Sequence, residues 1–253
     1  MRSSIVFYLI ALSLLSGCKS GTSDQKLTGS IKRDDSAPAA NLLPAESEED
    51  GTKASPESSL TLVKESFAES YVPPKRGTVY TYHNNWASLP KVIKYKVSGV
   101  ERIGSRKYLK FTSVAGLKNP VHAYYNLKNF NLKGYRDLSG KAVVTFMPAE
   151  QRYRFPLKPG DKWLTKWQSK DHKKNEVTSG GGIVRVEQIE QLALPIGVYK
   201  TVRVRLPMPS NAPRGMTHHL WFSPKLGVTV KEQIKSTSMN WTQILAKIDS
   251  PAS

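Results

Sequence analysis

The sequence predicts an all-β protein, built as a strongly curved antiparallel sheet in a half-barrel or a sandwich, after a disordered tether that can hold one short helix. Apolar and polar residues alternate with a period of two through most of the chain after residue 72, and glycine or proline turns separate the runs. No stretch there keeps a helical period for ten residues. The 253 residues are 39% hydrophobic and 23% charged, which is typical of a globular protein and not of a polytopic membrane protein.

The N-terminus has the pattern of a signal peptide. Arg2 supplies a positive charge, and residues 5–15 are almost wholly apolar. A run of about 11 apolar residues suits the hydrophobic region of a signal peptide and is too short to span a bilayer. Residues 1–17 are therefore predicted to be a signal peptide.

The sequence Leu15-Ser16-Gly17-Cys18 resembles the lipobox of bacterial lipoproteins. The resemblance implies that Cys18 carries acyl chains and anchors the mature protein in a membrane. Two or more acyl chains make such anchoring stable. Lys19 follows the cysteine, and similarity to enterobacterial sorting then implies the outer membrane, with the protein facing the periplasm. Because Cys18 is the only cysteine, an internal disulfide and a cysteine-rich zinc site are excluded.

Residues 18–72 are predicted to form a disordered acidic tether behind the lipidated cysteine. Residues 19–72 contain 6 basic and 10 acidic residues, together with many serines, alanines and glycines. Leu60, Val63 and Phe67 have helical spacing, so residues 59–70 are the candidate for a short helix. A flexible tether of this length spans roughly 40 Å. It would either let the following domain work away from the membrane or act only as a passive spacer.

Residues 73–250 are predicted to form a basic antiparallel β domain. Residues 78–82 begin the alternation, and residues 93–97 and 107–114 form a hairpin around a Gly104-Ser105 turn. Further strands are predicted at residues 121–126, 142–147, 152–155, 163–168, 183–191, 201–206, 217–222, 228–234 and 239–248. Gly180 to Gly182 lack the Lys-Ser/Thr of a phosphate-binding loop and are predicted to lie in a flexible hairpin loop.

Three segments of this domain resemble a broad group of uncharacterised bacterial envelope proteins. Residues 155–163 match its Phe-Pro-Leu…Gly…Trp segment, residues 194–201 its Pro-x-Gly-x-Tyr turn, and residues 220–231 its aromatic pair followed by proline and Gly-Val. The resemblance covers about residues 77–248. It implies curved sheets related to the half-barrels of periplasmic lipoprotein carriers. The matching residues are turn and packing signals, so the resemblance implies a fold and no activity.

The basic residues are the main functional signal. The whole chain has a net charge of +18. Residues 73–253 account for this positive charge, because they contain 31 basic and only 10 acidic residues. Several basic residues are spaced two apart on predicted strands and so share a face. The candidate anion-binding residues are Lys94 and Lys96, Arg152 and Arg154, and Arg203 and Arg205. Whether these pairs converge in space, or form a dispersed solvated surface, is left open by the sequence.

Catalytic and metal motifs are not found. There is no G-x-S-x-G elbow and no H-E-x-x-H, and adjacent strand residues such as His218 and His219 point to opposite faces. We therefore expect no enzyme activity, no catalytic residues, no metal and no cofactor.

Three functions remain. The first is a non-enzymatic envelope lipoprotein whose basic domain binds an anionic lipid, lipopolysaccharide or glycan. The second is a lipid or lipoprotein carrier, which needs an apolar cavity. The third is a structural subunit that binds another envelope protein. Nucleic acid fits the charge, but the export signal argues against it as the physiological partner.

Overall fold

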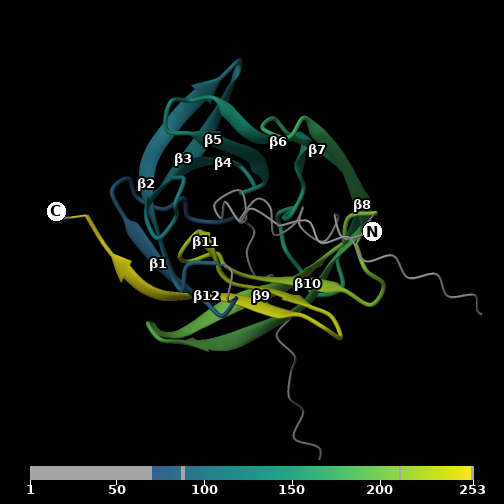
Figure 1. Ribbon diagram of the computed structural model, residues 1–253. Helices are drawn as coiled ribbons and strands as arrows, with labels where there is room; N and C mark the ends of the chain where they lie inside the picture. Colours follow the sequence, from purple (N-terminus) through teal and green to yellow (C-terminus); the bar gives the residue numbers. More distant parts are fainter. Residues whose placement is uncertain (1–69, 87–88, 211, 252–253) are drawn as a thin grey trace, which may run out of the picture. The chain divides into compact units, whose positions relative to one another are not determined.

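Twelve strands are present in the computed structural model, which describes residues 70–86, 89–210 and 212–251 (Figure 1). They are β1 (Val79–Asn84), β2 (Val92–Ile103), β3 (Arg106–Ala115), β4 (Val121–Asn126), β5 (Leu132–Asp137), β6 (Ala142–Glu150), β7 (Lys162–Asp171), β8 (Glu176–Leu194), β9 (Gly197–Leu206), β10 (Thr217–Ser223), β11 (Val228–Lys235) and β12 (Asn240–Asp249). No helix occurs in these residues, so the all-β class predicted from the sequence is confirmed.

The strands form one antiparallel meander that closes on itself. Each strand pairs with the next strand in the sequence, and β1 pairs with β12 from Val79↔Asp249 to Asn84↔Gln243. The curvature therefore goes further than in a half-barrel, because the first and last strands meet. Register shifts occur in several ladders, for example between Thr81 and Tyr82. Such bulges increase local twist and help a sheet to close.

Alternation along each strand separates an inner face from an outer face. On β7, Trp163, Thr165 and Trp167 are buried, whereas Leu164 and Lys166 between them are exposed. The same alternation places Val184 and Val186 of β8 in the core. Because a residue's face follows from its parity along the strand, basic residues two apart do share a face wherever a strand is regular.

Two local predictions are wrong, and one strand is missing from the prediction. Residues 152–155 are not a strand but part of the connection between β6 and β7. Gly180 to Gly182 lie in the middle of β8, paired with Trp167 to Thr165 of β7. β5 is absent from the predicted strands. Its Gly134 lies where two backbones approach closely, so that a Cβ there would lie 2.3 Å from the carbonyl oxygen of Val144.

The packed part of the chain begins before residue 73. Tyr71, which the sequence assigned to the tether, is buried, and its hydroxyl donates to the carbonyl oxygen of Leu127 at 2.8 Å. Its ring stacks on Phe155 and meets Phe222 edge-on. Cys18 and most of the candidate helix at residues 59–70 lie outside the described residues.

Candidate functional site

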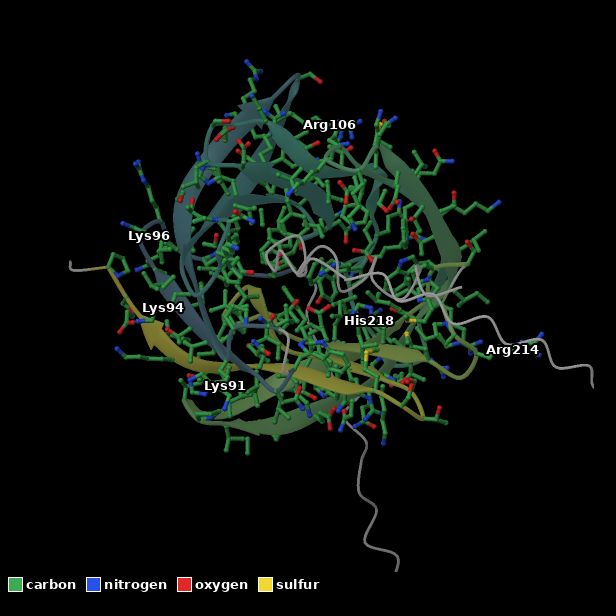
Figure 2. All side chains as sticks on the ribbon, in the orientation of Figure 1. Lys91, Lys94, Lys96, Arg106, Arg214 and His218 are labelled. Atoms are coloured by element: carbon green, nitrogen blue, oxygen red, sulfur yellow. The ribbon has the colours of Figure 1, made fainter. Side chains whose placement is uncertain are left out.

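The lysine pair on β2 projects outward, as the spacing predicts. Lys94 and Lys96 are exposed and, with Lys91, lie on one side of the barrel in Figure 2. β2 is separated from β9, which carries Arg203 and Arg205, by β1, β12, β11 and β10. These two basic pairs therefore do not form one site.

Arg152 and Arg154 do not share a face. Arg152 is buried, and its Nε donates to Oε2 of Glu150 at 2.7 Å, whereas Arg154 is exposed. The connection that holds Arg152 is fixed by Asn131, whose side-chain amide makes two hydrogen bonds with the backbone of Tyr153. Arg152 is therefore removed from the predicted outer anion site.

Arg203 and Arg205 share the outer face of β9 but have different surroundings. Nε of Arg203 donates to Oε2 of Glu187 at 2.8 Å, and its Nη1 lies 3.9 Å from Oε1 of Glu190. Arg205 is exposed and makes no ion pair among the described residues. Arg203 is thus held by carboxylates of its own chain, and Arg205 is available to another molecule.

The partners of Arg205 lie across the strands and not along β9. Arg185 of β8 is directly opposite Arg205, and Lys162 of β7 is directly opposite Arg185. All three are exposed and have no ion pair within the described chain. Directly opposed side chains have Cβ atoms about 4.5–5.5 Å apart. We call Lys162, Arg185 and Arg205 the basic row.

Carboxylates close to the basic row are engaged elsewhere. Asp161 accepts a hydrogen bond from the backbone nitrogen of Lys158, and Glu187 binds Arg203. Glu190 accepts a hydrogen bond of 2.6 Å from Nε1 of Trp221. None of these carboxylates forms an ion pair with the basic row in the described part of the chain.

The sequence contains a partial signal for this row. Lys162 and Arg185 each occupy an outward position in an alternating strand, but their direct opposition depends on the β7–β8 and β8–β9 registers, which include a bulge between Val186 and Gln188. Sequence alternation predicts the face of a residue and leaves its cross-strand neighbour unknown.

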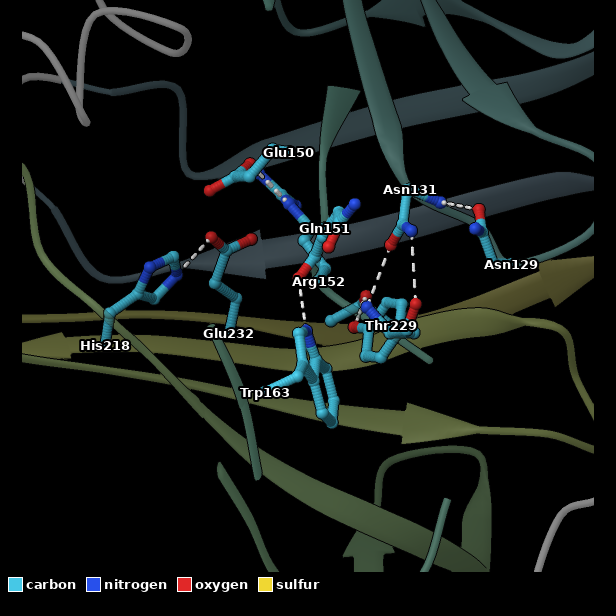
Figure 3. A network of polar contacts seen from close by, with 10 residues as sticks. Asn129, Asn131, Glu150, Gln151, Arg152, Trp163, His218, Thr229 and Glu232 are labelled. Carbon is cyan, nitrogen blue, oxygen red and sulfur yellow. Dashed lines mark hydrogen bonds and ion pairs between the residues drawn. The ribbon is translucent and has the colours of Figure 1, made fainter. Parts of the chain in front are cut away.

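A second polar group lies inside the barrel (Figure 3). Glu150 and His218 are 2% and 0% exposed, and Nε2 of His218 lies 2.7 Å from Oε1 of Glu232. Arg152 donates to Glu150, as Figure 3 shows, and its charge also acts on Glu232. Buried charges of this kind are stable only when paired, so Arg152, Glu150, Glu232 and His218 act as one unit. We call these four residues the inner network.

The inner network shifts the proton affinities of its members. Burial alone disfavours the charged guanidinium of Arg152, but Glu150 and Glu232 outweigh this, and the pKa of Arg152 lies above its usual value. Burial alone would also raise the pKa of Glu232. The hydrogen bond and charge of His218, with the charge of Arg152, hold the pKa of Glu232 below its usual value instead. Both groups are therefore charged at neutral pH.

The inner network borders a cavity of about 100 Å³ inside the barrel. Its walls are largely aromatic and include Tyr95, Tyr125, Phe146 and Trp167. Burial raises the pKa of Tyr125 to about 12, so its hydroxyl stays protonated at neutral pH. The cavity is smaller than the 150 Å³ apolar cavity that accommodates a benzene ring in an engineered protein core. It has space for water or a few atoms and not for an acyl chain.

The two adjacent histidines lie in different environments. His218 points into the barrel toward Glu232, whereas Nε2 of His219 lies 3.4 Å from Glu187 on the outer face. Burial lowers the pKa of His219, and Glu187 acts against that shift. The two side chains thus point to opposite faces, as predicted for adjacent residues on a strand. Within the described residues no group of three or more His, Cys, Asp or Glu side chains could hold a metal ion.

The described ranges contain no helix that is long and apolar enough to cross a bilayer.

Comparison with known proteins gives two structural neighbours. No family model and no curated protein sequence matches the chain. One neighbour is a "putative exported protein with YmcC-like fold" from Bacteroides fragilis, with 15% identity and a TM-score of 0.46 over 72% of this chain and 99% of that chain. The other is a "putative lipoprotein" from Parabacteroides distasonis, with 16% identity and a TM-score of 0.45 over 71% of this chain and 99% of that chain.

Proposed function

We propose that this protein is a lipid-anchored protein of the bacterial cell envelope whose barrel binds an anionic envelope component without catalysing a reaction. The lipobox-like sequence ending at Cys18 supports the anchor and the location, with the outer membrane implied by Lys19. One observation carries the binding function: Lys162, Arg185 and Arg205 are directly opposed on three adjacent strands and have no carboxylate partner among the described residues.

The physical argument is that this arrangement costs stability unless an anion offsets it. Like charges directly opposite each other in a sheet destabilise the pairing. A phosphate or carboxylate on the row relieves the repulsion, and each guanidinium can bind such a group with two parallel hydrogen bonds. The envelope supplies phosphates and carboxylates on its lipids, lipopolysaccharide and glycans.

The inner cavity argues for surface binding over the carrier alternative. A lipid carrier needs an apolar interior large enough for acyl chains. The cavity here is about 100 Å³ and is bordered by Arg152, Glu150 and Glu232. The structural-subunit alternative predicts a protein partner in stoichiometric amounts, and crosslinking of the intact envelope would reveal it.

The test uses a soluble fragment of residues 19–253, which contains every described residue and both strands that close the barrel. Its binding to lipopolysaccharide, peptidoglycan and anionic liposomes is measured across a salt series. We expect saturable binding to at least one of them that weakens with salt and falls at least about tenfold in R185A/R205A. The matched control is K94A/K96A, which removes the same charge from β2, a strand separated from β8 and β9 by at least four others. Equal losses in both variants would show that net charge, and not the basic row, drives binding.

A further inference from the structure

The outer face of β6, β7 and β8 alternates cationic and apolar rows. Next to the basic row, Leu164 of β7 lies directly opposite Ile183 of β8, and the row after that pairs Lys166 with Gly181. Residues two apart on a strand are about 6.6 Å from each other. The Leu164–Ile183 pair is therefore bordered by positive charge on both sides. Figure 1 shows β6, β7 and β8 side by side in the wall of the barrel.

Three apolar residues of this face are largely exposed. Leu164 is 65%, Met147 58% and Ile183 48% exposed. Exposed valines also occur on β2 and β3, but Val100 has the buried Leu109 opposite it and does not form a pair of exposed apolar residues. Single exposed apolar residues are normal on a protein surface, whereas a contiguous group within a polar rim marks an interaction site.

A groove of about 620 Å³ lies over this face. Met147, Leu164 and Lys166 border it, and Gly180 to Gly182 line its floor. The glycines are required by packing as well. A Cβ at Gly180 would lie 2.2 Å from the ring of Trp167, and one at Gly181 would lie 2.8 Å from the carbonyl oxygen of Thr165. At these three positions β8 therefore presents backbone and no side chain to the groove, with Lys166 beside it.

Acidic side chains are scarce on the same face. Asp171 is buried and accepts hydrogen bonds from the backbone nitrogens of Lys173 and Lys174. Glu176 is exposed at the far end of the β7–β8 hairpin, and Lys170 lies one position before Asp171 on β7. The face is thus cationic over most of its length, with apolar side chains projecting between the cations.

We infer that the face of β6, β7 and β8 docks on the surface of an anionic lipid bilayer. The inference rests on the proposed function and names its ligand class. Lipid phosphates would meet the basic row and Lys166, while Leu164, Ile183 and Met147 would enter the boundary between headgroups and acyl chains. Apolar groups of peripheral proteins reach about 5–10 Å into that boundary. A soluble polyanion would use the cations and leave the exposed apolar pair in water.

The predicted anchor is consistent with this occupant. Cys18 and residues up to 69 lie outside the described residues. Acyl chains on Cys18, as the lipobox-like sequence implies, would keep the barrel close to a membrane. Local tethering raises the effective concentration of a weak second contact. Cationic residues near an anionic leaflet then add attraction that falls off within a Debye length.

The experiment measures binding of the 19–253 fragment to phosphatidylcholine vesicles with and without phosphatidylglycerol, and to heparin as a soluble polyanion. The test variant is L164T/I183T, which removes both apolar side chains and places threonine, a β-branched residue that is favoured in strands, at each position. The matched control is V100T/V114T, which removes two exposed apolar side chains elsewhere. We expect L164T/I183T to weaken binding to the anionic vesicles about ten- to a hundredfold and to leave heparin binding unchanged. The control should bind like the unmodified fragment.

A positional readout completes the test. The fragment lacks Cys18 and so has no cysteine, which allows a single labelled cysteine in L164C or V100C. An environment-sensitive fluorophore at residue 164 should shift to the blue with anionic vesicles, and one at residue 100 should not. Unchanged vesicle binding by L164T/I183T, with no shift at residue 164, would overturn the lipid inference while salt-sensitive heparin binding still supports the proposed function. No binding to vesicles, heparin, lipopolysaccharide or peptidoglycan would overturn both.

Discussion

Arg185 of β8 lies directly opposite Arg205 of β9, and neither guanidinium has an ion-pair partner in the described part of the chain. Such an arrangement is tolerated because both side chains are exposed and water screens their repulsion. The repulsion between the two arginines nevertheless lowers the stability of this part of the sheet, while the same charges favour binding of an anion. Residues kept for binding are expected to be replaceable without loss of stability.

The first prediction follows from this relationship. R185A/R205A should be as stable as the unmodified fragment, or more stable by a few tenths of a kcal/mol, because the substitution relieves like-charge repulsion. Urea unfolding at low salt measures the difference, and added salt should reduce it. A loss of more than about 1 kcal/mol would instead assign the two arginines a structural role.

The second prediction concerns the inner network. R152A should destabilise the barrel by about 3–5 kcal/mol, because it leaves the carboxylates of Glu150 and Glu232 buried without their cation. Urea unfolding measures this as well. The matched control is R154A, which removes an exposed arginine two residues away and should change stability by less than about 0.5 kcal/mol. Similar effects of the two substitutions would show that Arg152 is not the charge that holds the inner network.

The third prediction tests the glycines of β8. G180A should destabilise the protein by about 1–3 kcal/mol, because its methyl group would overlap the ring of Trp167, which is itself buried against Phe146. The tryptophan fluorescence of the folded state should change with it. G215A, in a loop where nothing lies within 4 Å of the added carbon, shows the cost of a positive φ without a clash. Gly180 has no positive φ, so a loss of stability in G180A comes from the contact with Trp167, and unchanged stability of G180A would mean that this contact is unimportant.

Sequence patterns predicted the class of fold because each strand alternates between a packed interior and water. They could not show that Lys162, Arg185 and Arg205 meet, since this depends on the registers of two ladders and on a bulge. The spacing of Arg203 and Arg205 along β9 predicted that the two residues form one anion-binding pair. The structure separates them, because Glu187 on β8 reaches Arg203 and leaves Arg205 exposed.

Arg152 shows a different limit. The sequence Arg-Tyr-Arg-Phe at residues 152–155 has the alternation of an exposed strand. The hydrogen bonds between Asn131 and Tyr153 hold this segment against the core, and Glu150 accepts the buried guanidinium. Asn131 and Glu150 are both within 21 residues of Arg152 in the sequence, but no local sequence pattern predicts that they contact this segment. The inner network is therefore visible only in the folded chain.

The fourth prediction is a pH dependence due to Glu232. The folded-state pKa of Glu232 lies below the reference value of 4.5, so the charged form is stabilised by folding. The contribution of this carboxylate to stability is then fully present above pH 4.5 and is lost as the pH falls through the folded-state pKa. Accordingly, E232Q should be less stable than the unmodified fragment by about 1–3 kcal/mol near neutral pH, and this difference should shrink below pH 4.5.

Urea midpoints measured from neutral pH down to the acid transition test this dependence. E101Q is the control, because Glu101 also has a lowered pKa, through Lys110, but lies on the outer face where water screens the pair. E101Q should therefore change the pH profile much less than E232Q does. If the profile of E232Q runs parallel to that of the unmodified fragment across the acid range, the charge of Glu232 does not stabilise the barrel. The interior would then be held by its aromatic packing alone, with His218 and Arg152 satisfied by other groups.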